Sequence, residues 1–366
     1  MSFTTLGAPA LAAPTMTLAL GEEQGYVDIS WTAVENATRY SLFYRKVGDE
    51  SYTNVKLDKS VTSYQITVEI GAQYQAYVRG IYDYDDGTIF SGTMCSVQTI
   101  LASWTKYRAL LIGQTYPTWD DPLPGPDVDA RAMKSMLSAM SGTPYTSTLK
   151  LNLTDSGIIS AISSAFAGAT ENDVSLFYYS GHGAYSEDTS YLGALCGTEG
   201  YVTVSQLKAA LDQIPGKKIV LLDSCHSGAH IGKSINISSG LYTVSRTAMQ
   251  NFNSSVISAF ASRSKTNMAT DNYYVITAAR SVETSQSVSS DGVNWVGAFT
   301  YALCYGNGYD ELGGSFLGGL YCDSNSDNLI SLAECYSYAY TQAKNINSDQ
   351  NAQVYPTGSN FTLWGK

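Results

Sequence analysis

Residues 172–183 (NDVSLFYYSGHG) and residues 218–228 (KIVLLDSCHSG) decide the fold, because each joins a short apolar run to a polar end that carries glycine. A fully apolar run of this length is typical of a strand that is buried on both faces. Similar runs and stretches of helical apolar spacing alternate along the chain at 107–113, 127–140, 204–214 and 273–278. This alternation predicts an α/β domain with a mostly parallel sheet that helices cover on both faces. In such sheets, ligands and chemistry gather beyond the carboxyl ends of the strands.

Each of the two strand ends offers one group that a cysteine peptidase needs. Such an enzyme requires a thiolate, a base that forms it and backbone N–H donors for the oxyanion. Cys225 follows the second run, and His182 follows the first between two glycines. His226 directly follows Cys225 and His230 lies farther along the loop, so only His182 comes from a separate strand. We therefore predict Cys225 as nucleophile, His182 as base, and the N–H groups of Gly183 and Cys225 as oxyanion donors.

Each motif has a simpler interpretation when it is taken alone. A cysteine after a strand is more often a small buried hydrophobic residue than a nucleophile. Gly-His-Gly is usually a turn. A metal site made of Cys225, His226 and His230 would lack a fourth ligand nearby and is a poor match to zinc. The joint placement of His182 and Cys225 at the ends of two predicted parallel strands favours catalysis.

The two motifs together resemble the signature of metacaspases and bacterial caspase-like peptidases. Other segments resemble that family's first strand, first helix, later strand and later helix, at 109–113, 127–133, 277–281 and 297–303. The resemblance covers residues 105–366. It implies the caspase-haemoglobinase fold and cysteine endopeptidase activity that requires no cofactor.

Asp223 suggests the substrate class, because it places an anion two residues before the nucleophile. A carboxylate near the pocket for the residue before the scissile bond (P1) would pair with a guanidinium or an ammonium group. In metacaspase-like enzymes the matching aspartate lines that pocket, and the resemblance adds Asp129 and Ser180 to it. We expect peptide or protein substrates that are cleaved after Arg or Lys. The competing roles are turn capping by Asp223 and helix capping by Asp127 or Asp129.

A long polar stretch, residues 228–265, follows the nucleophile and is rich in Ser and Asn. Loops of that length are usually functional or disordered. The stretch contains four basic residues, Lys233, Arg246, Arg263 and Lys265. An enzyme that cuts after basic residues could process itself there.

Residues 323–334 (DSNSDNLISLAE) match the pattern of a twelve-residue calcium loop. The oxygen ligands would come from Asp323, Asn325, Asp327, the carbonyl of Leu329, and Glu334. Asn328 stands where the pattern has glycine, and asparagine can adopt the left-handed conformation needed there. Ser331 and Glu334 also form a capping-box pattern that would open a helix reaching residue 343. Calcium is therefore a candidate ligand, and a purely structural role is the alternative.

The front of the chain, residues 13–101, has a different pattern. Short alternating segments at 25–31, 39–45 and 64–68 are separated by turn residues, which is typical of an all-β sandwich. Trp31 lies where an early strand would bury a large aromatic residue, and residues 71–79 resemble a tyrosine corner that leads into a late strand. This segment resembles a fibronectin type III module, and a β-sandwich of another family is the alternative.

Composition restricts the partners. The 366 residues suffice for two domains, and 44% hydrophobic residues can fill a sizeable core. A net charge of −11 disfavours nucleic acid, whose phosphates are also anionic. No stretch approaches the length of a membrane span. The first twenty residues lack the basic start of a signal peptide, so the signal of a secreted protein would lie outside this sequence. We expect a monomeric, extracellular or cell-surface bacterial protein.

Two other functions are compatible with the same features. The chain could be a catalytically silent adhesion or scaffold protein whose front module binds a partner. Retention of both His182 and Cys225 argues against this alternative. A transferase that uses the same acyl-enzyme is a further alternative.

Overall fold

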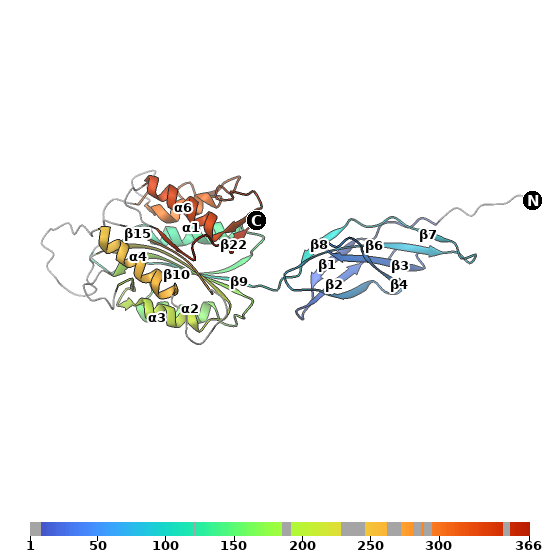
Figure 1. Cartoon of the computed structure of the whole chain (residues 1–366), viewed down its shortest axis with the longest axis horizontal. Helices are drawn as coiled ribbons and strands as arrows, with labels where there is room; N and C mark the ends of the chain where they lie inside the picture. The colour runs from blue at the N-terminus through green and yellow to red at the C-terminus, as the bar shows by residue number, and fades with distance from the viewer. Residues whose placement is uncertain are drawn as a thin grey trace, which may run out of the picture. The chain divides into compact units, whose positions relative to one another are not determined.

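The computed structural model describes residues 9–120, 122–184, 192–227, 246–261, 272–280, 287–288, 295–346 and 352–366. The chain divides into two compact units, one up to Trp104 and one from Thr105 onward (Figure 1). None of the helices within the described ranges is long and apolar enough to span a membrane.

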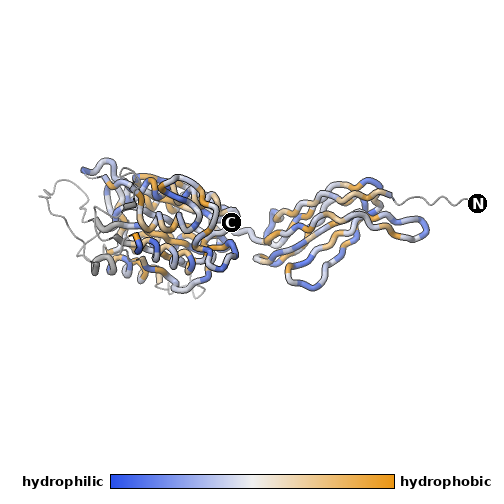
Figure 2. The backbone as a smooth tube through the Cα atoms, turned by 90° about the horizontal axis from the view of Figure 1, so that it is seen from above, coloured by the Kyte–Doolittle hydropathy of each residue, from blue (hydrophilic) through white to orange (hydrophobic). Residues whose placement is uncertain are grey.

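The first unit consists of two antiparallel sheets. Its strands are Met16–Leu20 (β1), Tyr26–Trp31 (β2), Arg39–Lys46 (β3), Thr53–Asp58 (β4), Ser63–Thr67 (β5), Gln73–Asp83 (β6), Ile89–Ser91 (β7) and Gln98–Leu101 (β8). One sheet has the order β1-β2-β5, and the other has the order β4-β3-β6-β7 with β8 also paired to β6. Hydrophobic and hydrophilic residues alternate along these strands (Figure 2). The predicted fibronectin III-like sandwich is confirmed.

The aromatic residues singled out in this unit have the predicted roles. Trp31 is buried in the core and makes an edge contact with Tyr40, with ring centroids 5.6 Å apart. The hydroxyl of Tyr74 accepts a hydrogen bond from the backbone N–H of Glu69, five residues upstream, at 3.1 Å. This bond is that of a tyrosine corner, and it fixes the turn into β6.

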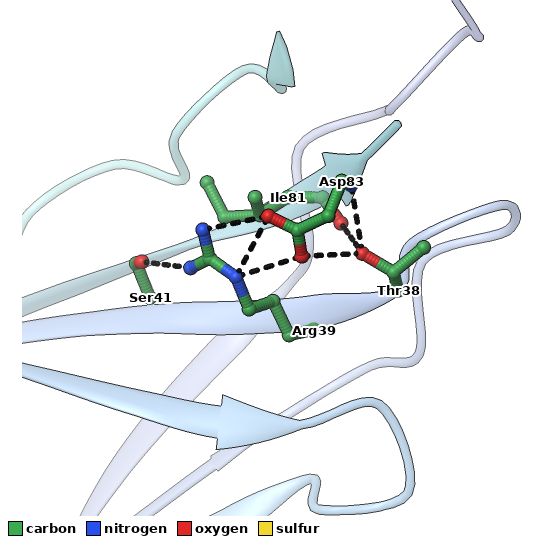
Figure 3. Close-up of polar contacts among 5 residues, drawn as sticks. All are labelled: Thr38, Arg39, Ser41, Ile81 and Asp83. Atoms are coloured by element: carbon green, nitrogen blue, oxygen red, sulfur yellow. Dashed lines mark hydrogen bonds and ion pairs between the residues drawn. The ribbon is translucent and has the colours of Figure 1, made fainter. Parts of the chain in front are cut away.

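A polar cluster joins β3 to β6 at the surface of the first unit (Figure 3). Arg39 Nε and Nη2 donate to the Asp83 carboxylate at 2.8 and 3.0 Å. Thr38 Oγ1 donates to Asp83 Oδ2 at 2.9 Å and to the carbonyl of Ile81 at 3.1 Å. The Arg39 and Asp83 side chains remain 20% and 39% exposed, so solvent screens the pair and weakens it.

The second unit is built on one large sheet. Its main strands are Tyr107–Gly113 (β9), Tyr145–Leu151 (β10), Val174–Ala184 (β11), Lys217–Ser227 (β14), Tyr273–Arg280 (β15) and Gln353–Tyr355 (β21). They have the order β10-β9-β11-β14-β15-β21, and all neighbours are parallel except β15 and β21. Shorter strands are Leu195–Cys196 (β12), Tyr201–Val202 (β13), Ser287–Val288 (β16), Val296–Gly297 (β17), Tyr309–Asp310 (β18), Ser315–Phe316 (β19), Leu329–Ser331 (β20) and Thr362–Gly365 (β22). The mostly parallel sheet is confirmed.

Helices cover both faces of this sheet. They are Pro126–Ser138 (α1), Asp155–Ala165 (α2), Val204–Asp212 (α3), Arg246–Ala261 (α4), Ala298–Gly306 (α5) and Leu332–Ile346 (α6). Leu111 faces the core with α1, α5 and α6, whereas its neighbour Leu110 faces the core with α2, α3 and α4. Both leucines are fully buried, and each such burial stabilises the fold by about 1.5–3 kcal/mol. The continuous apolar runs of the sequence result from this double coverage.

The predicted cap of α1 is wrong. The N-cap is Gly125, which has a φ of 108° and makes no side-chain capping bond. A Cβ atom at this glycine would lie 2.7 Å from the carbonyl oxygen of Trp295, so only glycine fits. The Asp129 carboxylate is hydrogen-bonded to residues outside α1.

The expectation of one long loop over residues 228–265 is also wrong in part. Residues 246–261 of that stretch form α4, whose Phe252 and Val256 are buried in the core beside the sheet. Arg246 is the first residue of α4. Lys233, Arg263 and Lys265 lie outside the described residues.

Candidate active site

The backbones of the two predicted catalytic residues are paired. Strands β11 and β14 run parallel and remain in register from Val174 opposite Lys217 to Ala184 opposite Ser227. His182 stands opposite Cys225 in this register. Neighbouring strands lie about 4.8 Å apart, so the sheet itself holds the two backbones close together. The side chain of Cys225 lies outside what the structure describes.

Cys225 follows the apolar run in the sequence, but it still lies within the strand and not beyond it. Strand β14 continues through Cys225 to Ser227, and β11 continues through His182 to Ala184. Both residues thus lie among the last paired positions of their strands, at the carboxyl edge of the sheet, where active sites of α/β folds are found.

His182 is almost completely buried, with 5% of its surface exposed. This burial lowers the pKa of the imidazole to about 3, because the charged form loses its hydration. The ring is therefore neutral at neutral pH and can accept a proton. Its Nδ1 atom is buried and has no hydrogen-bond partner among the described groups.

The two glycines beside His182 are required by the packing of the protein itself. A Cβ at Gly181 would lie 2.8 Å from the Tyr179 hydroxyl and 3.0 Å from the Tyr116 hydroxyl. A Cβ at Gly183 would lie 2.8 Å from the Phe252 ring. At each position the 2.8 Å distance is shorter than real Cβ contacts, so a side chain at either position would displace its neighbours.

Two of the three predicted pocket residues are in direct contact. Ser180 Oγ donates to Asp129 Oδ2 at 2.6 Å, and the N–H of Gly297 donates to Asp129 Oδ1 at 2.7 Å. Ser180 and Asp129 are each 1% exposed. Helix capping by Asp129 is therefore excluded, because its carboxylate reaches from α1 to the sheet and to the residue that precedes α5.

The third pocket residue, Asp223, stands opposite Ser180 in the strand register. Its Oδ2 atom accepts from the Thr300 backbone N–H at 3.1 Å and from the Thr300 hydroxyl at 2.7 Å. The Tyr178 hydroxyl lies 2.7 Å from the same Thr300 oxygen. Asp223 is fully buried, and its bond to Thr300 satisfies an N–H of the first turn of α5.

Sequence reasoning missed Gly297, Thr300 and Tyr178. Thr300 lies in the first turn of α5, and threonine is too common at such positions for the sequence to identify it as the partner of Asp223. Strand register brings Ser180 and Asp223 together, and the packing of α1 and α5 on one face adds the other residues.

The predicted calcium segment folds around its own backbone. Asp323 Oδ2 accepts from the N–H of Asn328 at 2.9 Å, and Asp327 Oδ1 accepts from the N–H of Leu329 at 2.8 Å. Asn325 Oδ1 accepts from the N–H of Asp327 at 2.9 Å. Asn328 has the expected left-handed conformation, with a φ of 64°. No group of three or more His, Cys, Asp or Glu side chains is arranged as metal ligands within the described ranges.

Glu334 has a structural role in this segment. Its Oε2 accepts from the N–H of Ser331 at 3.0 Å, and Ser331 Oγ accepts from the N–H of Glu334 at 3.2 Å. These two bonds confirm the capping box that opens α6. Burial alone would raise the pKa of Glu334, but hydrogen bonds from Ser331 and Ser324 outweigh it and lower the pKa.

Five cysteines have described side chains, and each is a free, buried thiol: Cys95, Cys196, Cys304, Cys322 and Cys335. Burial raises the pKa of Cys322 to about 12 and that of Cys196 still higher. These two thiols remain protonated at neutral pH and are poor nucleophiles.

The fold and the two strand-end motifs define a cysteine peptidase of the caspase-like class. Comparison with known families agrees, because the sequence model of the caspase domain matches residues 106–308, more than half of the chain. The chain belongs to the caspase domain family.

Several solved structures resemble parts of the chain. Protein GSU0716 from Geobacter sulfurreducens is 18% identical over 68% of this chain and 92% of its own, with a TM-score of 0.41. Two structures of fibronectin type III domains from human collagen XX, 17% and 23% identical, have TM-scores of 0.22 and 0.20. They cover 27% and 26% of this chain, and 92% and 99% of their own. A search among curated proteins returned no match.

Proposed function

We propose that this cysteine peptidase is an endopeptidase that cleaves after Arg or Lys through a Cys225–His182 dyad. The observation that carries the proposal is the pairing of His182 with Cys225 on neighbouring parallel strands. Two residues earlier in the same register, Ser180 stands opposite Asp223. The proposed nucleophile and base and two of the three pocket residues, Ser180 and Asp223, thus share one pair of strands.

In the proposed reaction, neutral His182 removes the thiol proton as the sulfur of Cys225 attacks the scissile carbonyl. The N–H groups of Gly183 and Cys225 stabilise the oxyanion. The imidazolium then protonates the departing amine, which leaves a thioester. Water attacks the thioester, loses a proton to His182, and the acid product leaves as the thiol is regenerated. Because the pKa of His182 is about 3, its imidazole is neutral before the attack and takes up the thiol proton as the sulfur attacks.

The acidic pocket supports a basic P1 residue. Asp129 and Asp223 are buried carboxylates, and each accepts a backbone N–H at the start of α5, from Gly297 and Thr300 respectively. Two carboxylates at this edge of the sheet would attract a guanidinium or an ammonium group of a substrate, and a planar guanidinium can bind a carboxylate in bidentate geometry.

Hydrolysis of fluorogenic peptides with Arg, Lys or Asp at P1 tests the proposal, with wild type, Cys225→Ala and His182→Ala compared. We expect cleavage after Arg and Lys, and a loss of at least about 100-fold in each variant. Cleavage after Asp would retain the dyad and contradict the pocket. No cleavage before or after limited proteolysis would favour the silent scaffold.

Self-processing follows from the same specificity. Arg246 and the basic residues outside the described ranges are the candidate sites. A single intact band on a denaturing gel after prolonged incubation of active enzyme would contradict self-processing, and Cys225→Ala is the control.

Calcium binding by residues 323–334 remains a separate proposal. The left-handed Asn328 and the oxygens of Asp323, Asn325 and Asp327 support it. Isothermal titration calorimetry with calcium chloride tests it. Absence of heat in wild type would remove the proposal, and heat that is lost in Asp323→Asn would support it.

A further inference from the structure

His182 belongs to a cluster of three aromatic rings that lies nearly in one orientation. The ring centroids of His182 and Tyr116 are 4.8 Å apart at an interplanar angle of 16°. Trp119 lies 5.8 Å from His182 at 10° and 4.1 Å from Tyr116 at 24°. The separation of Trp119 from His182 is far shorter than the sum of the other two, so the Tyr116 ring does not lie between them. Offset, near-parallel rings at these distances attract one another.

Tyr116 also holds the backbone of His182. Its hydroxyl accepts from the His182 N–H at 2.9 Å and lies 3.0 Å from the Tyr179 hydroxyl. The Tyr179 hydroxyl lies 2.8 Å from the His182 carbonyl oxygen. One proton assignment runs from the His182 N–H through the two phenols to the His182 carbonyl. Both hydroxyls also lie within hydrogen-bond distance of the Cys196 carbonyl oxygen, at 3.1 Å for Tyr116 and 2.9 Å for Tyr179. Burial raises the pKa of Tyr116, so this phenol keeps its proton.

The segment that carries the two rings is itself fixed. Asn152 Oδ1 accepts from the N–H groups of Thr115 and Tyr116 at 2.8 and 3.1 Å. Tyr116 has a left-handed backbone, with a φ of 50°, which is uncommon for a tyrosine and requires such support. The indole Nε1 of Trp119 donates to the carbonyl of Thr198 at 3.1 Å. The rings therefore have little freedom to rotate away from His182.

We propose that Tyr116 and Trp119 are positioning residues for His182, which orient its imidazole for proton transfer and stabilise it when it becomes charged. The inference rests on the proposed function, in which His182 is the base. A proton can be transferred efficiently only when the ring nitrogen points at the reacting group. The buried Nδ1 has no described partner that would fix the ring plane, and the two aromatic faces provide that constraint instead.

The same faces act during the reaction. An imidazolium formed in a buried site has lost its hydration, and this loss opposes proton transfer. Aromatic faces attract a nearby cation, most strongly where water is excluded. Removal of either ring should thus slow the chemical step more than it weakens substrate binding.

The test compares ring-removing with ring-preserving substitutions in the full chain: Trp119→Leu with Trp119→Phe, and Tyr116→Leu with Tyr116→Phe. We expect Trp119→Leu to lower kcat about tenfold with KM within about twofold, and Trp119→Phe to recover most of the loss. Tyr116→Leu should lower kcat further, since it also removes the hydroxyl, and Tyr116→Phe should fall between it and wild type.

Tyr107→Leu is the matched control. Tyr107 packs against Tyr145, with ring centroids 5.2 Å apart and an interplanar angle of 58°, at the opposite end of the same sheet. This variant should lose thermal stability while kcat of the folded enzyme stays unchanged. If Trp119→Leu behaves in the same way as Tyr107→Leu, the rings have only a packing role and the proposal is overturned.

Proton NMR of the histidine ring provides a readout that needs no activity. The His182 Cε1 proton is identified as the signal absent from His182→Ala, and stacked rings should shift it from the usual position. We expect this shift to shrink in Trp119→Leu. An unchanged shift would contradict the ring contact. Full activity in His182→Ala would instead contradict the proposed function, whatever the shift, so the two failures are distinguishable.

Discussion

Aspartates are buried at both ends of the central sheet, but the groups that bind their carboxylates differ between the two ends. At the amino end, Asp173 directly precedes β11 and pairs with Arg108 at 2.9 Å, while Lys106 and Thr170 donate their N–H groups to it. At the carboxyl end, Asp129 accepts from a hydroxyl and a backbone amide. Asp173 thus receives a cation from its own chain.

We expect this difference in partners to distinguish aspartates that stabilise the fold from aspartates that serve the function. A carboxylate that is paired inside its own unit closes a local network and ties neighbouring segments together. A carboxylate at the carboxyl edge of a parallel sheet lies where α/β folds bind ligands. We therefore expect replacement of Asp173 to affect stability, and replacement of Asp129 or Asp223 to affect substrate recognition.

The largest expected effect comes from Asp129→Asn. The amide can still accept from Gly297, so the geometry is retained while the charge is removed. We expect kcat/KM for an Arg substrate to fall about 100-fold, with a small change in stability. Steady-state kinetics at several substrate concentrations measures this. Equal kinetics for the two proteins would exclude Asp129 from the pocket.

Asp173→Asn should have the opposite result. Its amide group must face at least one of the N–H donors of Lys106, Arg108 or Thr170, and it loses the ion pair. We expect a loss of about 2–3 kcal/mol in the free energy of unfolding of the second unit. Urea unfolding, followed by residual activity, measures it. Kinetics of the folded variant at 25 °C should match wild type, and a change in P1 preference would contradict the division of roles.

The loss in the free energy of unfolding caused by Asp173→Asn should depend on pH. Burial would raise the pKa of Asp173, but bonds from Lys106, Arg108 and Thr170 outweigh it and lower the pKa. A lowered folded pKa adds stability above the unfolded value, near 3.9, and this stability is lost as pH falls through the folded value. When the free energy of unfolding is plotted against pH, the curves of wild type and variant should therefore be parallel above about pH 5 and converge below about pH 4. Parallel curves down to pH 2 would argue against this coupling.

The smallest effect is expected for Asp83→Asn in the first unit. The bonds from Arg39 lower the pKa of Asp83, but both side chains are partly exposed and solvent screens the pair. We expect a slight fall in Tm that diminishes as salt is added, with no change in peptidase kinetics. A fall as large as that of Asp173→Asn would mean that exposure does not set the strength of these pairs.

The buried parts of the fold could be predicted from sequence, because burial leaves a pattern. The apolar run before Ser180 and the run before Asp223 identified β11 and β14, and Trp31 identified the core of the first unit. Strand β10 was missed because its residues are polar and half-exposed. The final residues of β11 and β14 were missed because pairing with neighbours, and not their own propensity, keeps them extended.

Some residues of the candidate site could likewise be predicted from the sequence, and others could not. The sequence motifs singled out His182 and Cys225, and strand order brought their backbones together. The partners of His182 were missed, since Tyr116 reaches it across 66 residues through a left-handed turn. Such contacts depend on the path of the loop that follows a strand, and the spacing of apolar residues in the sequence does not predict that path.

The pairing of β11 with β14 also constrains how this enzyme can change length. A residue inserted between Val174 and His182 would move His182 by about 3.3 Å along the strand and turn its side chain to the other face of the sheet. Substitution is compatible with that register, but insertion and deletion are not. Homologous chains should therefore vary in length outside these eleven paired positions and keep a constant count within them.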